Sequence, residues 1–395
     1  MAQNAPVGHR LVVLALLVAL GLVVGATPAA ASNPKAVLVA VDDAGHTRWK
    51  RAPGDHDLSV VGAFDGLVLT VGIPSCNTAA ATIRALDART GKQKWQRAVA
   101  AREGSIPLVA HAGNVVVAAT ADGLLQAFDG RTGRPRWRSA PLAGGSSYRS
   151  LVGVGDRLVV STEAPGSLPQ TTGALDAATG KTLWSLSVAG SWFGVPNPAA
   201  AGIAFTATPA GTTIDNSTTT ISAYDLETGV QRWRTTVHTR GARALTAAGA
   251  DLVFGADPLG APVPTATTTV VALDAATGEA RWTLPGVNAY FPPLVLVASG
   301  HVFADVDGKI AAVRPADGSV EWAVTDVGTP PFSIVADTKT LAVGTATGPR
   351  TSTNAYDVAE GRLRWRRQGL SPAAAGAATF YLSDRLGTSD CNVGA

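Results

Sequence analysis

The chain has 395 residues and a formal net charge of +3, from 32 Lys and Arg against 29 Asp and Glu. A chain this close to neutrality does not have the charge typical of a nucleic-acid-binding domain, whose basic residues also gather on one stripe. Here they are scattered, and many flank tryptophans, where solvation of an outer strand explains them: Arg48, Arg136, Arg232, Arg281 and Arg364. We therefore expect no nucleic-acid partner.

Residues 1–31 have the layout of a secretory signal peptide. Arg10 is followed by an apolar run from Leu11 to Ala26, and three alanines ending at Ala31 precede Ser32. This order of charged, apolar and small residues predicts cleavage after Ala31. An uncleaved membrane anchor is the alternative, although the run is shorter than the ~20 residues that a membrane span needs. We expect an exported protein, periplasmic or in the cell envelope, without a stable membrane span.

One short stretch recurs eight times in residues 32–395, and each copy begins with Ala and ends with Trp. The copies are Ala40–Trp49, Ala85–Trp95, Ala127–Trp137, Ala174–Trp184, Ala223–Trp233, Ala272–Trp282, Ala312–Trp322 and Ala355–Trp365. Each has Gly four residues before its Trp: Gly45, Gly91, Gly133, Gly180, Gly229, Gly278, Gly318 and Gly361. A spacing of roughly 40–50 residues is typical of propeller blades. Residues 32–395 are therefore predicted to form one repeat domain.

Each copy reads as the end of one strand, a tight turn and the start of the next strand. An Asp such as Asp176 can accept N–H bonds from the turn, and the Gly can adopt the positive φ that closes it. The Trp is large and apolar with one N–H that needs a partner, which suits a wedge between neighbouring sheets. The seventh copy has Arg314 in place of the Asp, so its turn must be satisfied differently.

The repeated stretch resembles the tryptophan-docking repeat of the pyrroloquinoline quinone (PQQ)-like β-propellers, and the resemblance covers essentially all of residues 32–395. It implies that each Trp lies on an outer strand and packs between adjacent blades. The family includes quinoprotein dehydrogenases and non-catalytic scaffolds, such as the propeller subunit of barrel-assembly machinery. Fold does not by itself decide between these functions.

Between the copies the sequence supplies two further strands per unit. In one unit, strands are predicted at Ser105–Ala110, Val115–Thr120, Leu124–Asp129 and Arg134–Ser139. The first unit begins late, at Ala36–Val41, and its missing strands are predicted at Ser371–Ala375 and Thr379–Ser383. We therefore expect an all-β, eight-bladed propeller of four-stranded antiparallel blades. Its ring is closed by N-terminal and C-terminal strands that share one blade, which leaves no open sheet edge. We expect a monomer.

The two cysteines, Cys76 and Cys391, fall in neighbouring blades of this arrangement. In an oxidising compartment they are predicted to form a disulfide, which would hold the C-terminal strands in place. Two free thiols are the alternative.

One face of the predicted disc is uneven. The loops between the second and third strands lengthen at residues 72–82, 163–173, 207–220 and 256–269, which is typical of a binding surface. Neutral insertion is the alternative. The connectors between blades carry Arg and aromatic residues that are candidates for partner contact. These are Arg149, Trp192, Phe193, His238, Arg243 and Tyr290. Each of them could instead be packed between blades.

The sequence gives little indication of catalysis. The histidines are dispersed, and none has a carboxylate or Cys at the spacing of a zinc site. Alcohol-oxidising members of the resembled family have two adjacent cysteines against PQQ, with calcium beneath it, whereas Cys76 and Cys391 are each followed by Asn. We expect no catalytic residues, cofactor or metal, and a scaffold or sensor that binds a protein partner. A PQQ-dependent dehydrogenase with PQQ and calcium, or a small-molecule or glycan binder, is the alternative.

Overall fold

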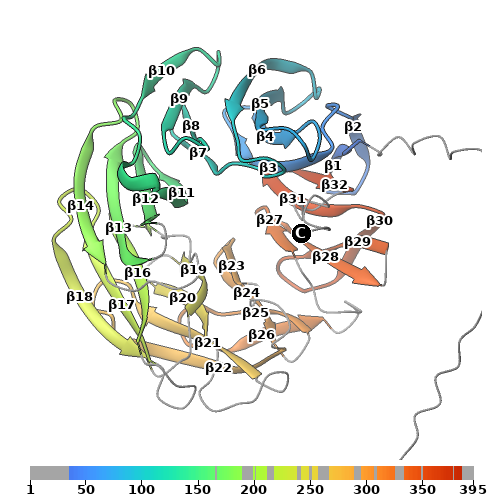
Figure 1. Cartoon of the computed structure of the whole chain (residues 1–395). Coiled ribbons are helices and arrows are strands. Elements are labelled where there is room, and N and C mark those ends of the chain that lie inside the picture. The colour runs from blue at the N-terminus through green and yellow to red at the C-terminus, as the bar shows by residue number, and fades with distance from the viewer. Residues whose placement is uncertain are drawn as a thin grey trace, which may run out of the picture. The chain divides into compact units, whose positions relative to one another are not determined.

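The computed structural model (Figure 1) divides into two compact units, Met1–Pro34 and Lys35–Ala395. It describes residues 35–395 except 165–166, 189–198, 201, 211–217, 238–241, 249–250, 257–266, 289–294, 307–308, 325–332, 348–349, 377 and 385–395. Within the described residues, no helix is long and apolar enough to cross a membrane. The expected signal peptide falls outside them and stays a prediction.

The described chain forms antiparallel sheets of four strands, which follow one another around a ring (Figure 1). The first sixteen strands are β1 Leu38–Asp42, β2 Thr47–Arg51, β3 Asp57–Phe64, β4 Leu67–Ile73, β5 Ala80–Asp87, β6 Gln93–Ala100, β7 Val109–Ala112, β8 Val115–Ala119, β9 Leu125–Asp129, β10 Pro135–Arg138, β11 Ser147–Val154, β12 Arg157–Ala164, β13 Ser167–Asp176, β14 Thr182–Val188, β15 Ala199–Ala200 and β16 Ile203–Ala210. The others are β17 Thr218–Asp225, β18 Gln231–Val237, β19 Ala242–Ala248, β20 Asp251–Ala256, β21 Thr267–Asp274, β22 Ala280–Asn288, β23 Val295–Ala298, β24 His301–Val306, β25 Lys309–Val313, β26 Val320–Val324, β27 Ser333–Ala336, β28 Thr340–Thr347, β29 Arg350–Asp357, β30 Leu363–Gln368, β31 Ser371–Gly376 and β32 Thr379–Ser383. One short 3₁₀ helix, η1, spans Ala143–Gly145.

The all-β prediction with four-stranded antiparallel blades is confirmed, but the predicted count of eight blades needs correction. Seven blades are continuous stretches of chain, from β3–β6 through β27–β30. The remaining four-stranded sheet, β2-β1-β32-β31, is not a continuous blade, because it combines strands from the two ends of the described chain. We call it the composite sheet. In Figure 1 its blue and red strands lie side by side. Strand β1 pairs with β32 from Leu38 opposite Ser383 to Asp42 opposite Thr379.

The first strand of the unit around residue 110 begins later than predicted. It spans Val109–Ala112 rather than Ser105–Ala110. Pro107 has no N–H to contribute to a ladder, which explains why the residues before Val109 stay outside the sheet. Leu108 nevertheless stays next to the sheet, because its carbonyl accepts a hydrogen bond from Ala119 N–H of β8 over 2.9 Å.

The repeated tryptophans lie on the outermost strands and contact the next sheet around the ring. In every copy the indole N–H donates to a backbone carbonyl in the turn of that next sheet, as Trp95 does to Gly130 over 2.8 Å. The other seven pairs are Trp49–Ala88, Trp137–Ala177, Trp184–Leu226, Trp233–Ala275, Trp282–Pro315, Trp322–Val358 and Trp365–Asp43. The last pair joins β30 to the composite sheet, so these contacts run around the whole ring.

The small residues of the repeat make room for the indole. The first Ala of each copy is buried and stands directly opposite the Trp of the same copy, as Ala85 does opposite Trp95. The Gly has positive φ and lies against the Trp of the preceding sheet. A Cβ added at Gly133 would lie 2.7 Å from the Trp95 ring, and its φ of 66° is one that other residues rarely adopt. The Gly is therefore required for two separate reasons.

The turn Asp organises the loop that receives the indole. The Asp129 carboxylate accepts hydrogen bonds from the backbone N–H and the hydroxyl of Thr132, and it forms an ion pair with Arg136 at 2.6 Å. Arg136, helped by Thr132, lowers the pKa of Asp129 to about 2. In the seventh copy Asp317 takes over from the repeated Asp, because its carboxylate accepts hydrogen bonds from the backbone N–H and the hydroxyl of Ser319. Arg314, which stands at the position of the repeated Asp, forms an ion pair with Glu321. The turn therefore keeps its shape without the repeated Asp.

Replacing Gly133 by Ala should lower the free energy of unfolding by roughly 2–4 kcal/mol, because both the strained φ and the overlap with Trp95 oppose the new methyl group. Gly155 is the matched control, since it also has positive φ, 58°, but nothing lies within 4 Å of an added Cβ. Chemical denaturation of the two Ala variants would measure the difference. Equal destabilisation would mean that the indole contact contributes nothing.

Stability should fall on acidification below about pH 4. Thr90 with Lys94 holds the pKa of Asp87 at about 2, and Arg281 holds that of Asp274 at about 2. Because an unfolded Asp titrates near 3.9, these carboxylates stabilise the fold fully above that pH and lose the effect as the pH falls toward 2. Thermal unfolding between pH 7 and 2 should show this fall, and Asp129→Asn should reduce it. A melting temperature that is constant down to pH 2.5 would contradict the assignment.

Candidate functional site

The candidate site lies on the face that carries the hairpins between second and third strands and the connectors between blades. Because neighbouring strands run in opposite directions, these hairpins and connectors lie on one face. The turns that receive the indoles, which we call the docking turns, lie on the other face. Two of the predicted long loops are largely strand. Strands β12 and β13 stay paired out to Ala164 opposite Ser167, and β16 and β17 out to Ala210 opposite Thr218. Their Thr-rich sequences favour extended pairing, which the loop prediction did not take into account.

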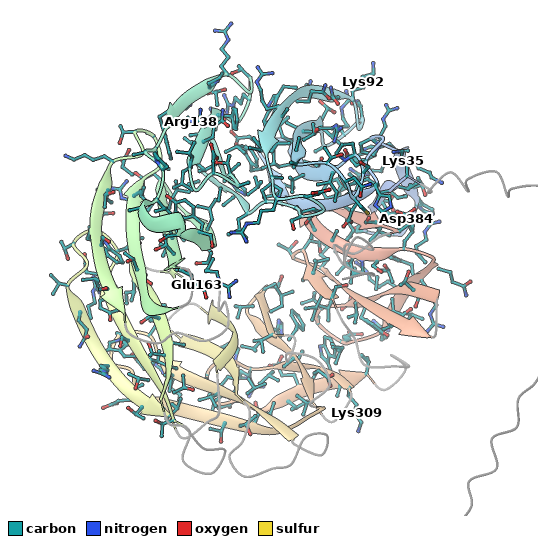
Figure 2. The ribbon with its side chains drawn as sticks, viewed as in Figure 1. Lys35, Lys92, Arg138, Glu163, Lys309 and Asp384 are labelled. Carbon is teal, nitrogen blue, oxygen red and sulfur yellow. The ribbon has the colours of Figure 1, made fainter. Side chains whose placement is uncertain are left out.

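Arg149 lies on β11, the innermost strand of its blade, at a β-bulge in that strand. Tyr148 pairs with Thr162 and Ser150 with Ser161, so that Arg149 is the extra residue. A bulge bends its strand and changes the direction of a side chain, and bulges are common beside functional sites. Arg149 forms an ion pair with Glu163 of β12, and both side chains are substantially exposed, 49% and 38%. Figure 2 shows Glu163 on the inner side of the ring.

The structure leaves the other predicted contact residues untested. Trp192, Phe193, His238 and Tyr290 lie outside the described residues. Arg243 lies in β19, where it pairs with Gly255 of β20. Sequence analysis did not find Glu163, which the fold brings to Arg149 from the neighbouring strand.

A buried ion pair between the composite sheet and the next blade was also missed. Asp55, in the connector before β3, pairs with Arg84 of β5, and both are buried, at 1% and 8% exposure. Burial raises the pKa of Asp55, and Arg84 opposes that rise. Removing one partner of such a pair would leave an uncompensated buried charge, so its position is strongly constrained. A lone Arg inside the apolar strand 80–87 was the available signal.

The same region ties both ends of the described chain to one place. Ala36 N–H donates to the carbonyl of Asp55 over 2.9 Å, and Lys35 donates to the carbonyl of Pro74 over 3.2 Å. Val37 N–H donates to the Asp384 carboxylate over 2.7 Å. Cys76 lies in the loop that follows Pro74. Cys391 lies outside the described residues, so the disulfide stays a prediction.

The dehydrogenase alternative needs ligands for calcium and, in the alcohol-oxidising members of the family, two adjacent cysteines beside PQQ. No group of three or more His, Cys, Asp or Glu side chains that could hold a metal occurs among the described residues. Neither cysteine is followed by a second cysteine.

Comparison with solved structures shows the fold. A computationally designed protein, Ika8, is 15% identical with a TM-score of 0.56, over 83% of this chain and 96% of its own. A europium-containing methanol dehydrogenase is 14% identical with a TM-score of 0.53, over 79% of this chain and 78% of its own. BamB from Moraxella catarrhalis is 16% identical with a TM-score of 0.48, over 86% of this chain and 88% of its own. The first two of these likenesses show the fold alone.

Comparison with curated proteins finds no match. A family model described as outer membrane protein assembly factor BamB matches three overlapping ranges, 34–191, 169–325 and 217–381. Together these ranges span residues 34–381, which include all the repeated tryptophans. The resemblance inferred from the repeat is thereby confirmed, and the chain belongs to this family of PQQ-like β-propellers.

Proposed function

We propose that the protein is an exported, non-catalytic scaffold or sensor that binds a protein partner through the face carrying Arg149 and Glu163. The observation that supports this most directly is the half-exposed Arg149–Glu163 pair on a bulged inner strand. Membership of a family described as an assembly factor also favours binding over catalysis. The partner is a folded or extended protein segment, and the chain acts without a cofactor.

A purely structural function explains this pair poorly. Exposed ion pairs typically contribute ~0–1 kcal/mol to stability. Arg is nevertheless among the residue types that dominate protein interfaces, because its planar group makes several directed hydrogen bonds. A partner carboxylate or backbone carbonyl could replace or extend the contact with Glu163. The pair is therefore suited to recognition.

Export places the protein outside the cytoplasm. The charged, apolar and small-residue order of residues 1–31 supports this localisation. The mature chain would begin at Ser32, three residues before the described unit.

Arg149→Ala should reduce capture of the partner by about tenfold while changing the melting temperature by less than about 2 °C, because it removes an exposed interface group and no buried contact. Capture would be measured by crosslinking the tagged protein in its exporting host and quantifying the associated proteins by mass spectrometry. The matched control is Arg131→Ala, since Arg131 is also exposed and paired, with Asp65 at 3.0 Å, but lies on the docking-turn face.

Equal loss of the same partner in both variants would contradict the assignment of the face. A large fall in the melting temperature of Arg149→Ala would show that the residue stabilises the fold. Dye-linked alcohol oxidation after addition of PQQ and calcium to the purified protein would contradict the scaffold proposal and support a dehydrogenase.

A further inference from the structure

Basic residues scattered in the sequence are gathered by the fold on one sector of the outer rim. The neighbouring outer strands β30, β2, β6 and β10 carry ten Arg and Lys and no Asp or Glu. The other four outer strands, β14, β18, β22 and β26, carry three Arg and one Glu. Figure 2 shows Arg138 of β10 at this outer edge. Four of the ten are paired with carboxylates of turns nearby: Lys94 with Asp87, Arg136 with Asp129, Arg138 with Asp122 and Arg364 with Asp357. The excess of positive charge on these strands therefore rests on the other six basic residues.

Three arginines of this sector have a common structural function. Arg367, Arg51 and Arg97 each follow a docking Trp by two residues, and each donates from Nε to the carbonyl of the docking Gly in the next sheet. The distances are 3.0, 3.1 and 2.7 Å, to Gly45, Gly91 and Gly133. The equivalent positions in the other copies are Ser139, Leu186, Thr235, Leu284 and Val324. The arginines therefore reinforce three consecutive contacts around the ring. These join blade β27–β30 to the composite sheet, the composite sheet to blade β3–β6, and blade β3–β6 to blade β7–β10.

Within the described residues, four arginines of these outer strands are bonded to neutral oxygens rather than to carboxylates. Arg51, Arg97 and Arg367 donate to carbonyl and hydroxyl oxygens, and Arg48 donates to the hydroxyl of Thr379 over 3.0 Å. A hydrogen bond to a neutral carbonyl leaves the full charge of the guanidinium in place. Lys50 lies between them on β2 and is exposed. We call these five residues, Arg48, Lys50, Arg51, Arg97 and Arg367, the cationic sector.

The position of this sector along the chain points to its ligand. The apolar run Leu11–Ala26 is joined by residues 27–34 to Lys35, which leads directly into β1. Strand β2, at the centre of the sector, is the antiparallel neighbour of β1. During export the apolar run enters the membrane, so the composite sheet is the part of the propeller covalently closest to it. Basic groups beside a membrane attract anionic lipid headgroups within about one Debye length.

We propose that the cationic sector binds the surface of a membrane containing anionic phospholipids. Lys50 and Arg48 interact with phosphate groups as solvated charges, and the three clamping arginines offer their remaining N–H donors. The contact keeps the mature protein at the membrane surface after the signal peptide is removed, while the face with Arg149 stays available for the protein partner. This inference depends on the proposed export for its setting, but lipid binding is measured independently of export or partner capture.

The test is cosedimentation of the purified exported protein with vesicles of phosphatidylglycerol and phosphatidylcholine, compared with pure phosphatidylcholine. Binding should require the anionic lipid and should be lost in 0.5 M salt. Lys50→Glu should weaken it about tenfold or more, because each basic group near such a surface contributes substantially to attraction.

The matched control is Arg234→Glu. Arg234 also directly follows a docking Trp, is exposed, and changes the net charge by the same amount, but it lies on β18 outside the sector. Its binding should stay within about twofold of the original protein, and both variants should keep the original melting temperature. Equal weakening by the two variants, equal binding to both kinds of vesicle, or preferential binding to a soluble nucleic acid would overturn the proposal.

Discussion

The ring depends on one repeated interaction, the insertion of an indole from the outer strand of one sheet into the turn of the next. The indole is apolar apart from a single N–H, and the receiving turn offers both a Gly without a side chain and a carbonyl at hydrogen-bond distance. Removing a buried Trp costs roughly 3–5 kcal/mol. Because each contact joins adjacent sheets, the interactions add along the ring much as interfaces do in a repeat protein.

Closing the ring is the difficult step, because the composite sheet has no continuous chain to hold its strands together. The structure compensates at this place in several ways. Strands β1 and β32 pair along their length, the ends are bonded through Asp55 and Asp384, and three arginines reinforce neighbouring tryptophan contacts. Strand pairing between distant ends carries a cost of loop closure, which these local contacts offset. The same arginines also give this sector its unbalanced positive charge.

Much of the fold could be predicted, because the repeat states both its own spacing and its own chemistry. Ala, Gly and Trp at fixed positions indicated that each Trp packs between neighbouring sheets. The first unit lacks two strands at the N-terminal end, and two extra strands near the C-terminal end indicated that both ends share one sheet. The continuous blades number seven rather than eight, and hairpins such as β12–β13 extend farther than predicted. A Pro at position 107 delays one strand, and Thr-rich segments lengthen others, which are local effects that the repeat does not encode.

The candidate sites were less predictable, since they depend on residues far apart in sequence. Arg149 could be chosen by residue type, but Glu163 and the buried Asp55–Arg84 pair become visible only when strands are placed in register. The cationic sector shows the same limitation, because basic residues that alternate with tryptophans in several copies look scattered until the ring brings their strands together. Composition gives the total charge, whereas topology decides where that charge lies.

The ring is held together by indole N–H groups, each of which donates to a carbonyl of the neighbouring sheet. Hydrogen exchange of ¹⁵N-labelled indole groups, followed by NMR in the folded protein, measures this directly. The account predicts eight indole N–H signals that exchange at least about a thousandfold more slowly than free tryptophan. Exchange of several of these signals at the rate of free tryptophan would contradict it.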